Sequence, residues 1–358
     1  MSNAAPTPRP APIRTPWDTP PPEGTAVEVA EDILWMRLPL PMALDHVNVY
    51  ALRDRDGDED GWTLVDTGFA TRRTRAIWET LLAGPLAGAP VRRVLVTHHH
   101  PDHVGLAGWF QATHGAELLT TRTAWLFARM LTLDAQERPA AETIAFWRAA
   151  GMTPEILEQR MAERPFNFAD CVAPMPLGFS RLAEGQTIML GGRAWHVRLG
   201  QGHAPDHATL WSQDGTLVIG GDQLLPSISP NLGAYATEPD ADPVAEWLAS
   251  CARFALEATD TQLVLPGHKL PFTGLPARLV QLADNHHGAL ARLRDWLAAS
   301  PRTAHECFTP LFKRDIGGGE YGLALVEAMA HLNHLHHAGE TRRTRRADGA
   351  WVYELAGS

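Results

Sequence analysis

A short polar stretch directly after a strand-like run constrains the fold of this chain more than any other feature. Residues 91–96 are mostly β-branched or apolar, and His98, His100, Asp102 and His103 follow in the next loop. A strand that ends in a polar loop delivers side chains to the open edge of a sheet. Imidazoles and a carboxylate can converge on a metal ion there without burying unpaired charge. The pattern therefore predicts a sheet with a metal site at its edge.

Four further stretches extend this pattern in chain order. Together with it they resemble the signature elements of the metallo-β-lactamase-fold hydrolases, and the resemblance covers residues 27–274. Most of these elements follow apolar, strand-like runs, as side chains at a sheet edge require. The four stretches are residues 62–68 with Asp66, residues 202–207 with His203, residues 218–222 with Asp222, and residues 263–268 with His268.

The resemblance implies an α/β fold, the metallo-β-lactamase αββα sandwich, and a ligand set for two metal ions. It also implies two catalytic carboxylates, Asp102 and Asp66. Asp66 is expected beside the metals, where it would orient the nucleophile or a ligand. In the implied ligand set one metal is held by His98, His100 and His203, the other by Asp102, His103 and His268, and both share Asp222.

The implied ligands are mostly neutral nitrogens with few carboxylates, which suits two Zn²⁺ ions per subunit, with iron and manganese as alternatives. Two metals about 3.5–4 Å apart lower the pKa of a bridging water toward about 7, so that hydroxide is available at neutral pH. A full ligand set argues against a degenerate, binding-only relative. It also argues against the mononuclear-iron persulfide dioxygenases, which do not use the ligands of the second metal.

Composition limits the classes of protein that fit. The chain has 358 residues, enough for one large domain and a smaller one. Its net charge is −10, which does not favour a broad surface for binding polyanions. The three cysteines have no metal or redox spacing, which favours a reducing compartment. No apolar run is long enough for a membrane span, and we expect a soluble, cytoplasmic protein.

The chain divides into three predicted parts. Residues 1–24 are rich in proline and should be extended, residues 25–274 form the catalytic domain, and residues 275–358 form a C-terminal domain. Within the catalytic domain, a helix is expected directly behind His103. Residues 121–170 should be a helical insertion that serves as extra core or a dimer face, or equally as a lid over the site.

The C-terminal domain should contain helices at 275–299, 303–312 and 321–338, followed by a β-hairpin. This order resembles the winged-helix-like domain of the lactamase-like endoribonucleases and of related bacterial hydrolases. Such a unit can bind DNA, but packing against the catalytic domain is the favoured role. The arginines that could contact phosphates are Arg342, Arg343, Arg345 and Arg346.

The remaining histidines are interpreted as structural. His207 is expected to support a ligand, and His99 is expected to be a surface residue of the metal loop. Four histidines near the C-terminus are interpreted as part of a helix end that faces solvent. These are His331, His334, His336 and His337. His286 and His287 are interpreted in the same way.

The sequence leaves three functions open. The favoured one is hydrolysis of a thioester, ester or lactone small molecule, because the chain is acidic and its insertion is apolar. The alternative is a metal-dependent ribonuclease or phosphodiesterase, which the His203–Asp222 spacing and the C-terminal domain resemble. A winged-helix regulator that binds nucleic acid is remote. A homodimer remains open, and glyoxalase II proper is disfavoured because its glutathione-binding arrangement is not visible.

Overall fold

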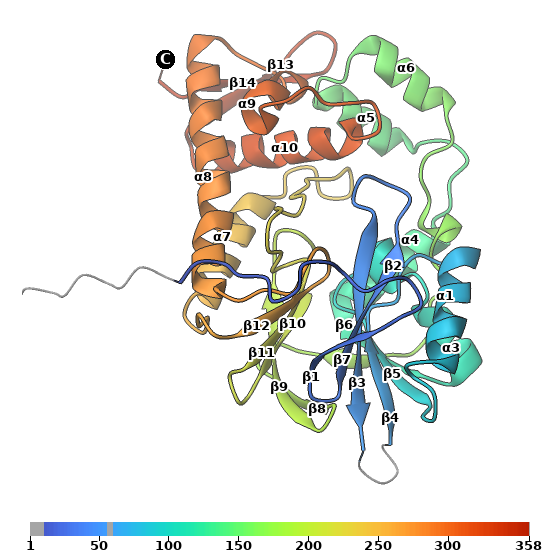
Figure 1. Cartoon of the computed structure of the whole chain (residues 1–358). Coiled ribbons are helices and arrows are strands. Elements are labelled where there is room, and N and C mark those ends of the chain that lie inside the picture. The colour runs from blue at the N-terminus through green and yellow to red at the C-terminus, as the bar shows by residue number, and fades with distance from the viewer. Residues whose placement is uncertain (1–10, 56–59, 358) are drawn as a thin grey trace, which may run out of the picture.

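Two β-sheets form the centre of the molecule in the computed structural model, which describes residues 11–55 and 60–357 (Figure 1). The first sheet has the order β1-β2-β3-β4-β5-β6-β7 and the second has the order β12-β11-β10-β9-β8. The strands of the first sheet are β1 (Val27–Ala30), β2 (Ile33–Pro39), β3 (His46–Asp54), β4 (Gly61–Val65), β5 (Val91–Leu95), β6 (Glu117–Thr121) and β7 (Ser180–Leu182). Those of the second sheet are β8 (Thr187–Leu190), β9 (Arg193–Gly200), β10 (His207–Ser212), β11 (Leu217–Gly221) and β12 (Leu263–Pro266).

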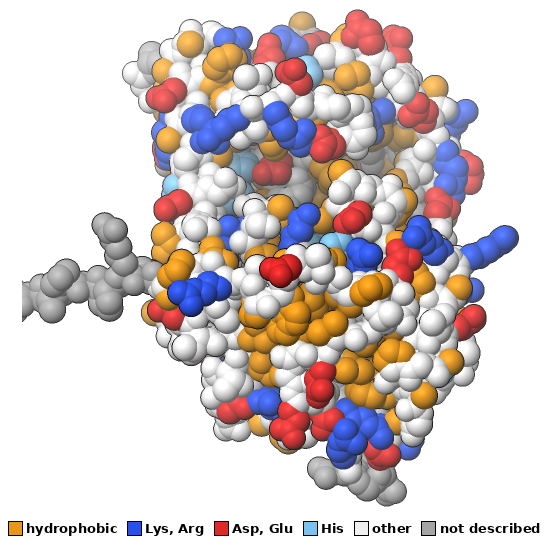
Figure 2. Space-filling model, in the orientation of Figure 1, with side chains coloured by type: hydrophobic (Ala, Val, Ile, Leu, Met, Phe, Trp, Pro, Cys, Tyr) orange, Lys and Arg blue, Asp and Glu red, His pale blue; other side chains and the backbone are white. Residues whose placement is uncertain are grey.

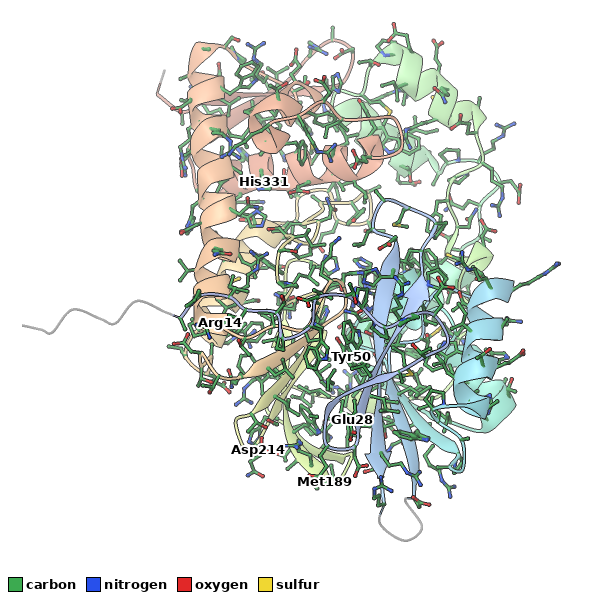
Figure 3. The ribbon with its side chains drawn as sticks, in the orientation of Figure 1. Arg14, Glu28, Tyr50, Met189, Asp214 and His331 are labelled. Carbon is green, nitrogen blue, oxygen red and sulfur yellow. The ribbon has the colours of Figure 1, made fainter. Side chains whose placement is uncertain are left out.

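The sheets pack face to face, with helices on their outer faces. Period-two alternation sends Trp35 of β2 into the core between the sheets, while Met36 faces the outer core. Tyr50 also lies between the sheets (Figure 3). The first sheet is covered by α1 (Arg72–Ala83), α3 (Ala107–His114) and α4 (Arg122–Leu133), and the second by α7 (Pro243–Phe254) and α8 (Leu275–Ala299). This is the predicted αββα sandwich.

Strand direction explains how distant motifs meet. β4 runs parallel to β5, and β11 runs parallel to β12, so both pairs end at one edge of their sheets. Asp66 follows β4, the His98–His103 loop follows β5, Asp222 follows β11, and His268 lies two residues after β12. One edge of the sandwich therefore collects the side chains of four motifs.

The predicted helix directly behind His103 begins at a different place. α2 (Pro101–Val104) contains Asp102 and His103 themselves, and α3 begins only at Ala107. Pro101 occupies the first helical position, where its fixed φ suits the helix and its missing N–H is not needed. The helix therefore starts within the metal loop rather than after it.

The insertion forms α4, α5 (Ala141–Ala149), α6 (Pro154–Ala162) and the 3-10 helix η2 (Phe168–Asp170). Phe146 of α5 is buried in the same apolar cluster as Phe308 and Leu325 of the C-terminal domain. The Arg160 guanidinium of α6 lies 5.7 Å from the centroid of the Tyr321 ring. Of the roles predicted for the insertion, α5 therefore has that of extra core, and it joins the insertion to the C-terminal domain.

The C-terminal domain has the predicted order of helices and hairpin: α8, η3 (His305–Cys307), α9 (Phe308–Phe312), α10 (Tyr321–His337), β13 (Thr341–Arg345) and β14 (Trp351–Leu355). Arg343 forms an ion pair with Asp240 at 2.7 Å, and Arg346 forms one with Asp348 at 2.7 Å. The Arg345 guanidinium lies 4.6 Å from the centroid of the Trp351 ring. Arg343 thus bonds to the connection before α7, whereas the contacts of Arg345 and Arg346 lie within the hairpin itself.

The interpretation of a solvent-facing histidine group is wrong for His331 and His286. Both are buried, and His286 Nδ1 lies 3.1 Å from His331 Nε2 (Figure 3). The cause is that α10 packs against both α7 and α9 and so has little free face. His334 contacts Asp242 at 3.1 Å and is only partly exposed.

Residues 11–24 lie outside the helices and named strands, contain several bends and a turn, and pass the start of α8 (Figure 1). Arg14 pairs with Thr273 through two backbone hydrogen bonds of 3.2 and 2.8 Å, and the Trp17 ring contacts the Trp35 ring at 5.9 Å. The rest of the predicted N-terminal segment, residues 1–10, lies outside the described residues. Across the described ranges, no helix combines the length and apolarity needed to cross a membrane.

Candidate metal centre

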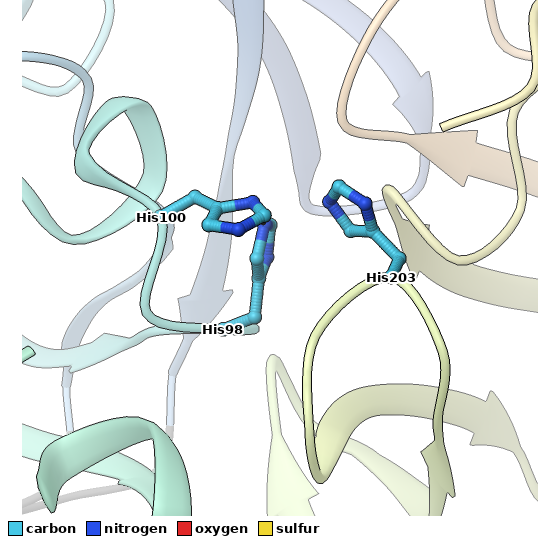
Figure 4. A group of neighbouring side chains, drawn as sticks. All are labelled: His98, His100 and His203. Carbon is cyan, nitrogen blue, oxygen red and sulfur yellow. The ribbon is translucent and has the colours of Figure 1, made fainter. Parts of the chain in front are cut away.

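All seven predicted ligands lie together at the edge where the strands end. Their donor atoms form three overlapping groups, and within each group they lie within 4.8 Å of one another. The groups are His98, His100 and His203; His98, His103 and Asp222; and Asp102, His103 and His268. Figure 4 shows the first group, in which His98 and His100 come from the loop after β5 and His203 approaches from the β9–β10 connection.

The first group is made of nitrogen atoms alone. His98 Nε2 lies 3.0 Å from His100 Nδ1, and the His203 ring centroid is 4.5 Å from that of His100 and 5.1 Å from that of His98. Imidazole nitrogens gathered in this way suit a borderline-soft divalent metal.

Hydrogen bonds fix which nitrogen is free in His103, His203 and His268. His103 Nδ1 donates to Asp66 Oδ2 at 2.8 Å, His203 Nδ1 to the carbonyl of Asn231 at 2.9 Å, and His268 Nδ1 to the carbonyl of His46 at 2.8 Å. These acceptors require a proton on Nδ1, so the lone pair of the neutral ring is on Nε2. In each case Nε2 therefore presents its lone pair to the cluster.

His98 is oriented in the same way through Thr97. The Thr97 hydroxyl donates to Asp66 Oδ2 at 2.9 Å, because a carboxylate can only accept. Its oxygen can then accept from His98 Nδ1, 3.0 Å away. His98 Nε2 is again the free nitrogen, and it is the atom that faces His100.

Asp222 is adjacent to histidines of both sides of the site. Its Oδ1 lies 3.4 Å from His103 Nε2, and its Oδ2 lies 3.5 Å from His203 Nε2 and 3.2 Å from His268 Nε2. Asp102 Oδ2 lies 3.5 Å from His103 Nε2 and 3.3 Å from His268 Nε2. Asp222 is therefore placed to be shared between two cations.

The fit of this cluster to metal ions rests on buried atoms with unmet needs. His103 Nε2, His203 Nε2 and Asp222 Oδ1 are buried and have no hydrogen-bond partner in the described part of the chain. Burying such atoms without a partner costs on the order of 1–3 kcal/mol each. Metal ions bound among them would satisfy all three, so the residues present fit a metal site.

The pKa shifts show the same demand for positive charge. Burial lowers the pKa of His103, but the carboxylates of Asp222, Asp102 and Asp66 outweigh burial and raise it well above its usual value. Burial also opposes protonation of His268, whose pKa Asp222 and Asp102 nevertheless raise to about 10. Burial raises the pKa of Asp222, but the positive charges of His268 and His103 hold it well below its usual value. The carboxylates thus attract cations to this edge.

Asp66 lies where the sequence predicted it, beside the cluster. It is buried, its φ is 61°, and it accepts hydrogen bonds from Thr97 N at 2.8 Å and from His103 Nδ1. The left-handed backbone conformation is one that aspartate tolerates better than most residues. Asp66 thereby holds the metal loop and one of its histidines in place.

His207 supports Asp222, in agreement with the prediction. Its Nε2 accepts a hydrogen bond from the backbone N–H of Asp222 at 3.1 Å. Gly221, with φ of 48°, makes room for the contact, since a Cβ there would lie 2.6 Å from His207 Cε1.

The prediction of a surface position for His99 is wrong. Its side chain is buried, and its ring lies 5.0 Å from the Phe127 ring and is stacked at 6.4 Å on the Phe168 ring. Both aromatic residues belong to the insertion, which covers this side of the metal loop. Aromatic side chains of the insertion, rather than solvent, therefore surround the His99 ring.

Two supports of the site were missed because they act through backbone carbonyls. These are the His46 carbonyl, which holds His268, and the Asn231 carbonyl, which holds His203. Asn48 and Tyr50 of β3 fix the loop that carries His268, since Asn48 Nδ2 and the Tyr50 hydroxyl donate to the Pro266 carbonyl at 2.9 and 2.8 Å. Only the side-chain interactions could have left a signal in the sequence.

Comparisons with known proteins identify the family. The model of the metallo-beta-lactamase superfamily matches residues 42–268, and that of the metallo-beta-lactamase-like C-terminal domain matches residues 290–356. A probable metallo-hydrolase of Bacillus subtilis (strain 168), YqjP, is 27% identical over 330 residues, which cover 90% of this chain and 97% of that protein.

Two solved structures are similar over nearly the whole chain. A beta-lactamase domain protein from Burkholderia ambifaria has 37% identity and a TM-score of 0.88, covering 96% of this chain and 98% of its own. A metallo-beta-lactamase family protein from Thermus thermophilus has 28% identity and a TM-score of 0.74, covering 92% of this chain and 100% of its own. With its fold, its clustered motifs and these matches, the chain belongs to the metallo-β-lactamase superfamily.

Proposed function

We propose that this chain is a dinuclear metal-dependent hydrolase whose substrate is a small-molecule thioester, ester or lactone. Membership of the superfamily and the likeness to a probable metallo-hydrolase support metal-dependent hydrolysis. The observation that carries the proposal is the convergence of seven donor side chains in three overlapping groups, with Asp222 adjacent to His103, His203 and His268.

The proposed ligands are those expected from the sequence. His98, His100 and His203 would hold one metal, Asp102, His103 and His268 the other, and Asp222 both. Zinc is the proposed metal, because the set is rich in imidazole. Two such ions, when bound, supply Lewis acidity toward the substrate oxygen and a hydroxide nucleophile at neutral pH.

The three carboxylates have different proposed roles. Asp66, whose side chain is 3% exposed, orients His103 and the Thr97 backbone and so keeps the metal loop in one geometry. Asp222, at 8%, is the shared ligand. Asp102 is the most exposed at 16%, so it is the carboxylate that a substrate or a water molecule can approach most closely. We therefore assign Asp102 a catalytic role besides metal binding.

The surface around the site favours a small molecule over a polyanion. The molecule is hollowed between the C-terminal domain and the sheets, and the Lys and Arg side chains on this face are scattered among acidic ones (Figure 2). Tyr235 and Leu323 are 44% and 54% exposed. Tyr235 follows Asn231 closely in the chain, and the Leu323 carbonyl accepts a hydrogen bond from the Asn231 side chain. Asn231 in turn holds His203. Exposed apolar groups near the support of a proposed metal ligand suit an acyl or aromatic portion of a substrate.

The test is turnover by the zinc-reconstituted protein on an acyl thioester, a lactone and single-stranded RNA, measured in parallel. We expect thioester or lactone cleavage that a chelator abolishes. Chelator-sensitive cleavage of RNA alone would overturn the proposal in favour of a ribonuclease or phosphodiesterase. Binding of nucleic acid without any turnover would instead favour the regulator.

We further propose that the protein works in the cytoplasm, where its three free cysteines would remain reduced. A homodimer is compatible with the exposed apolar side chains Leu126, Met130 and Leu133 on α4. Sedimentation of the purified protein measures the oligomeric state, and a single monomeric species would exclude the dimer.

A further inference from the structure

The second half of the connection between β11 and α7, from Asn231 to Ala241, is bonded to α10 of the C-terminal domain. Asn231 Nδ2 donates to the Leu323 carbonyl at 3.1 Å and to Glu327 Oε2 at 2.7 Å, and the Ala234 amide donates to the Val326 carbonyl at 3.1 Å. Further along, Asn333 Nδ2 donates to the carbonyls of Pro239 and Ala241 at 2.9 and 3.0 Å. α10 therefore determines the path of this connection.

The first residue of this bonded stretch is also the one that orients a proposed metal ligand. The Asn231 carbonyl accepts from His203 Nδ1 at 2.9 Å, while the Asn231 side chain is held by Glu327. The supports of His98, His103 and His268 are Thr97, Asp66 and the His46 carbonyl, all within the sandwich. Among these four histidines, His203 is the one whose support is anchored by the C-terminal domain.

Glu327 is an unfavourable choice if its only task is packing. It is partly buried, and burial raises the pKa of its carboxyl to about 7, although the hydrogen bond from Asn231 opposes this shift. An apolar side chain of similar size would fill the same space without a desolvation cost. The specific bond to Asn231 gives the carboxyl a task that leucine could not perform.

We propose that Glu327 is a positioning residue: by holding Asn231, it fixes the carbonyl that orients the His203 imidazole toward the first metal. The C-terminal domain then sets the geometry of one metal position and leaves the other to the sandwich. This inference rests on the proposed function, since it requires that His98, His100 and His203 hold a metal.

The test compares the variants Glu327→Leu, Glu327→Gln and Asn231→Ala with the full-length parent protein. Zinc affinity at each of the two positions is measured by competition with a chromophoric chelator, and ligand geometry by the visible spectrum after cobalt substitution. Glu320→Gln is the control, because Glu320 adjoins the start of the same helix but pairs with Arg314 on the surface. The free energy of unfolding of each variant is measured in urea without added metal.

We expect Glu327→Leu to weaken one of the two zinc ions by about 10- to 100-fold, the usual effect of removing a group that orients a ligand, and to change the cobalt spectrum. The free energy of unfolding should not fall. Glu327→Gln should recover most of the affinity, because its amide oxygen can still accept from Asn231. Asn231→Ala should weaken the same ion, and Glu320→Gln should behave as the parent does.

Two zinc ions bound by Glu327→Leu with parental affinity and spectrum would overturn the inference but not the proposed function. Equal loss of both ions together with lower stability would also overturn it, because that pattern indicates a general structural role. If the His203→Ala variant binds zinc as tightly as the parent protein does, the proposed function itself is overturned. If Glu327→Leu does not fold, the zinc affinity of Asn231→Ala decides in the same way.

Discussion

Replacing Asp222 by alanine is the sharpest test of the shared-ligand assignment. This one carboxylate lies 3.2–3.5 Å from Nε2 of His103, His203 and His268, so its loss removes a donor from both metal positions. Removing a group that only orients a ligand weakens metal binding by about 10- to 100-fold. Loss of a direct ligand should exceed the upper end of that range, which corresponds to about 3 kcal/mol for each ion.

The assay is zinc content after dialysis against a fixed free zinc concentration, together with turnover of the thioester or lactone. Asp222→Ala should bind at most one zinc ion and have no measurable turnover, while its circular dichroism stays close to that of the parent. Asp214→Ala is the matched control, because Asp214 lies in the β10–β11 turn at the far end of the sheets (Figure 3). Two zinc ions and full turnover in Asp222→Ala would refute the assignment.

Three further predictions concern other parts of the chain. Asp66→Asn should weaken one zinc ion by about 10- to 100-fold, because His103 loses a charged acceptor; unchanged zinc affinity would contradict that role. Burial lowers the pKa of His286 to about 3 and that of His331 to about 4, so the unfolded chain binds more protons below about pH 6.5. Urea unfolding should show stability falling by about 1.4 kcal/mol per pH unit for each of the two histidines between pH 6 and 5, and a smaller fall in His286→Leu. The hairpin arginines are Arg342, Arg343, Arg345 and Arg346. Neutralising them should leave turnover of a small ester unchanged. If the protein were a nuclease, the same variant would bind RNA more weakly and with a shallower salt dependence.

A local pattern predicts the sheet edge and the metal loop after residues 91–96, whereas the sandwich and the full ligand set are implied by the family resemblance. Residues 91–95 form β5 and the histidine loop follows directly, since a buried strand needs apolar side chains and its polar end can only lie at an edge. The same reasoning places Asp222 after β11 and His268 after β12. Helices 275–299 and 321–337 follow from their length and periodicity.

What the sequence does not predict depends on long-range contacts. Asn231 and His46 hold His203 and His268 through carbonyl groups, which every residue has, so the residue type carries no signal. His331 looks like part of a solvated helix end until α10 is packed against α7 and α9. His99 is covered by Phe127 and Phe168 of an insertion whose position no local pattern specifies.

The charge of the site connects these observations to the number of metal ions. Asp66, Asp102 and Asp222 bring three carboxylates into one largely buried edge, an arrangement that is unstable unless positive charge accompanies it. The raised pKa values of His103 and His268 reflect the same carboxylates, since a site that draws protons onto its imidazoles also draws cations. One divalent ion would leave the three carboxylates with a net negative charge, whereas two divalent ions together with one hydroxide would balance them. Metal ions and protons then compete for the same nitrogens, so zinc affinity should fall as the pH is lowered.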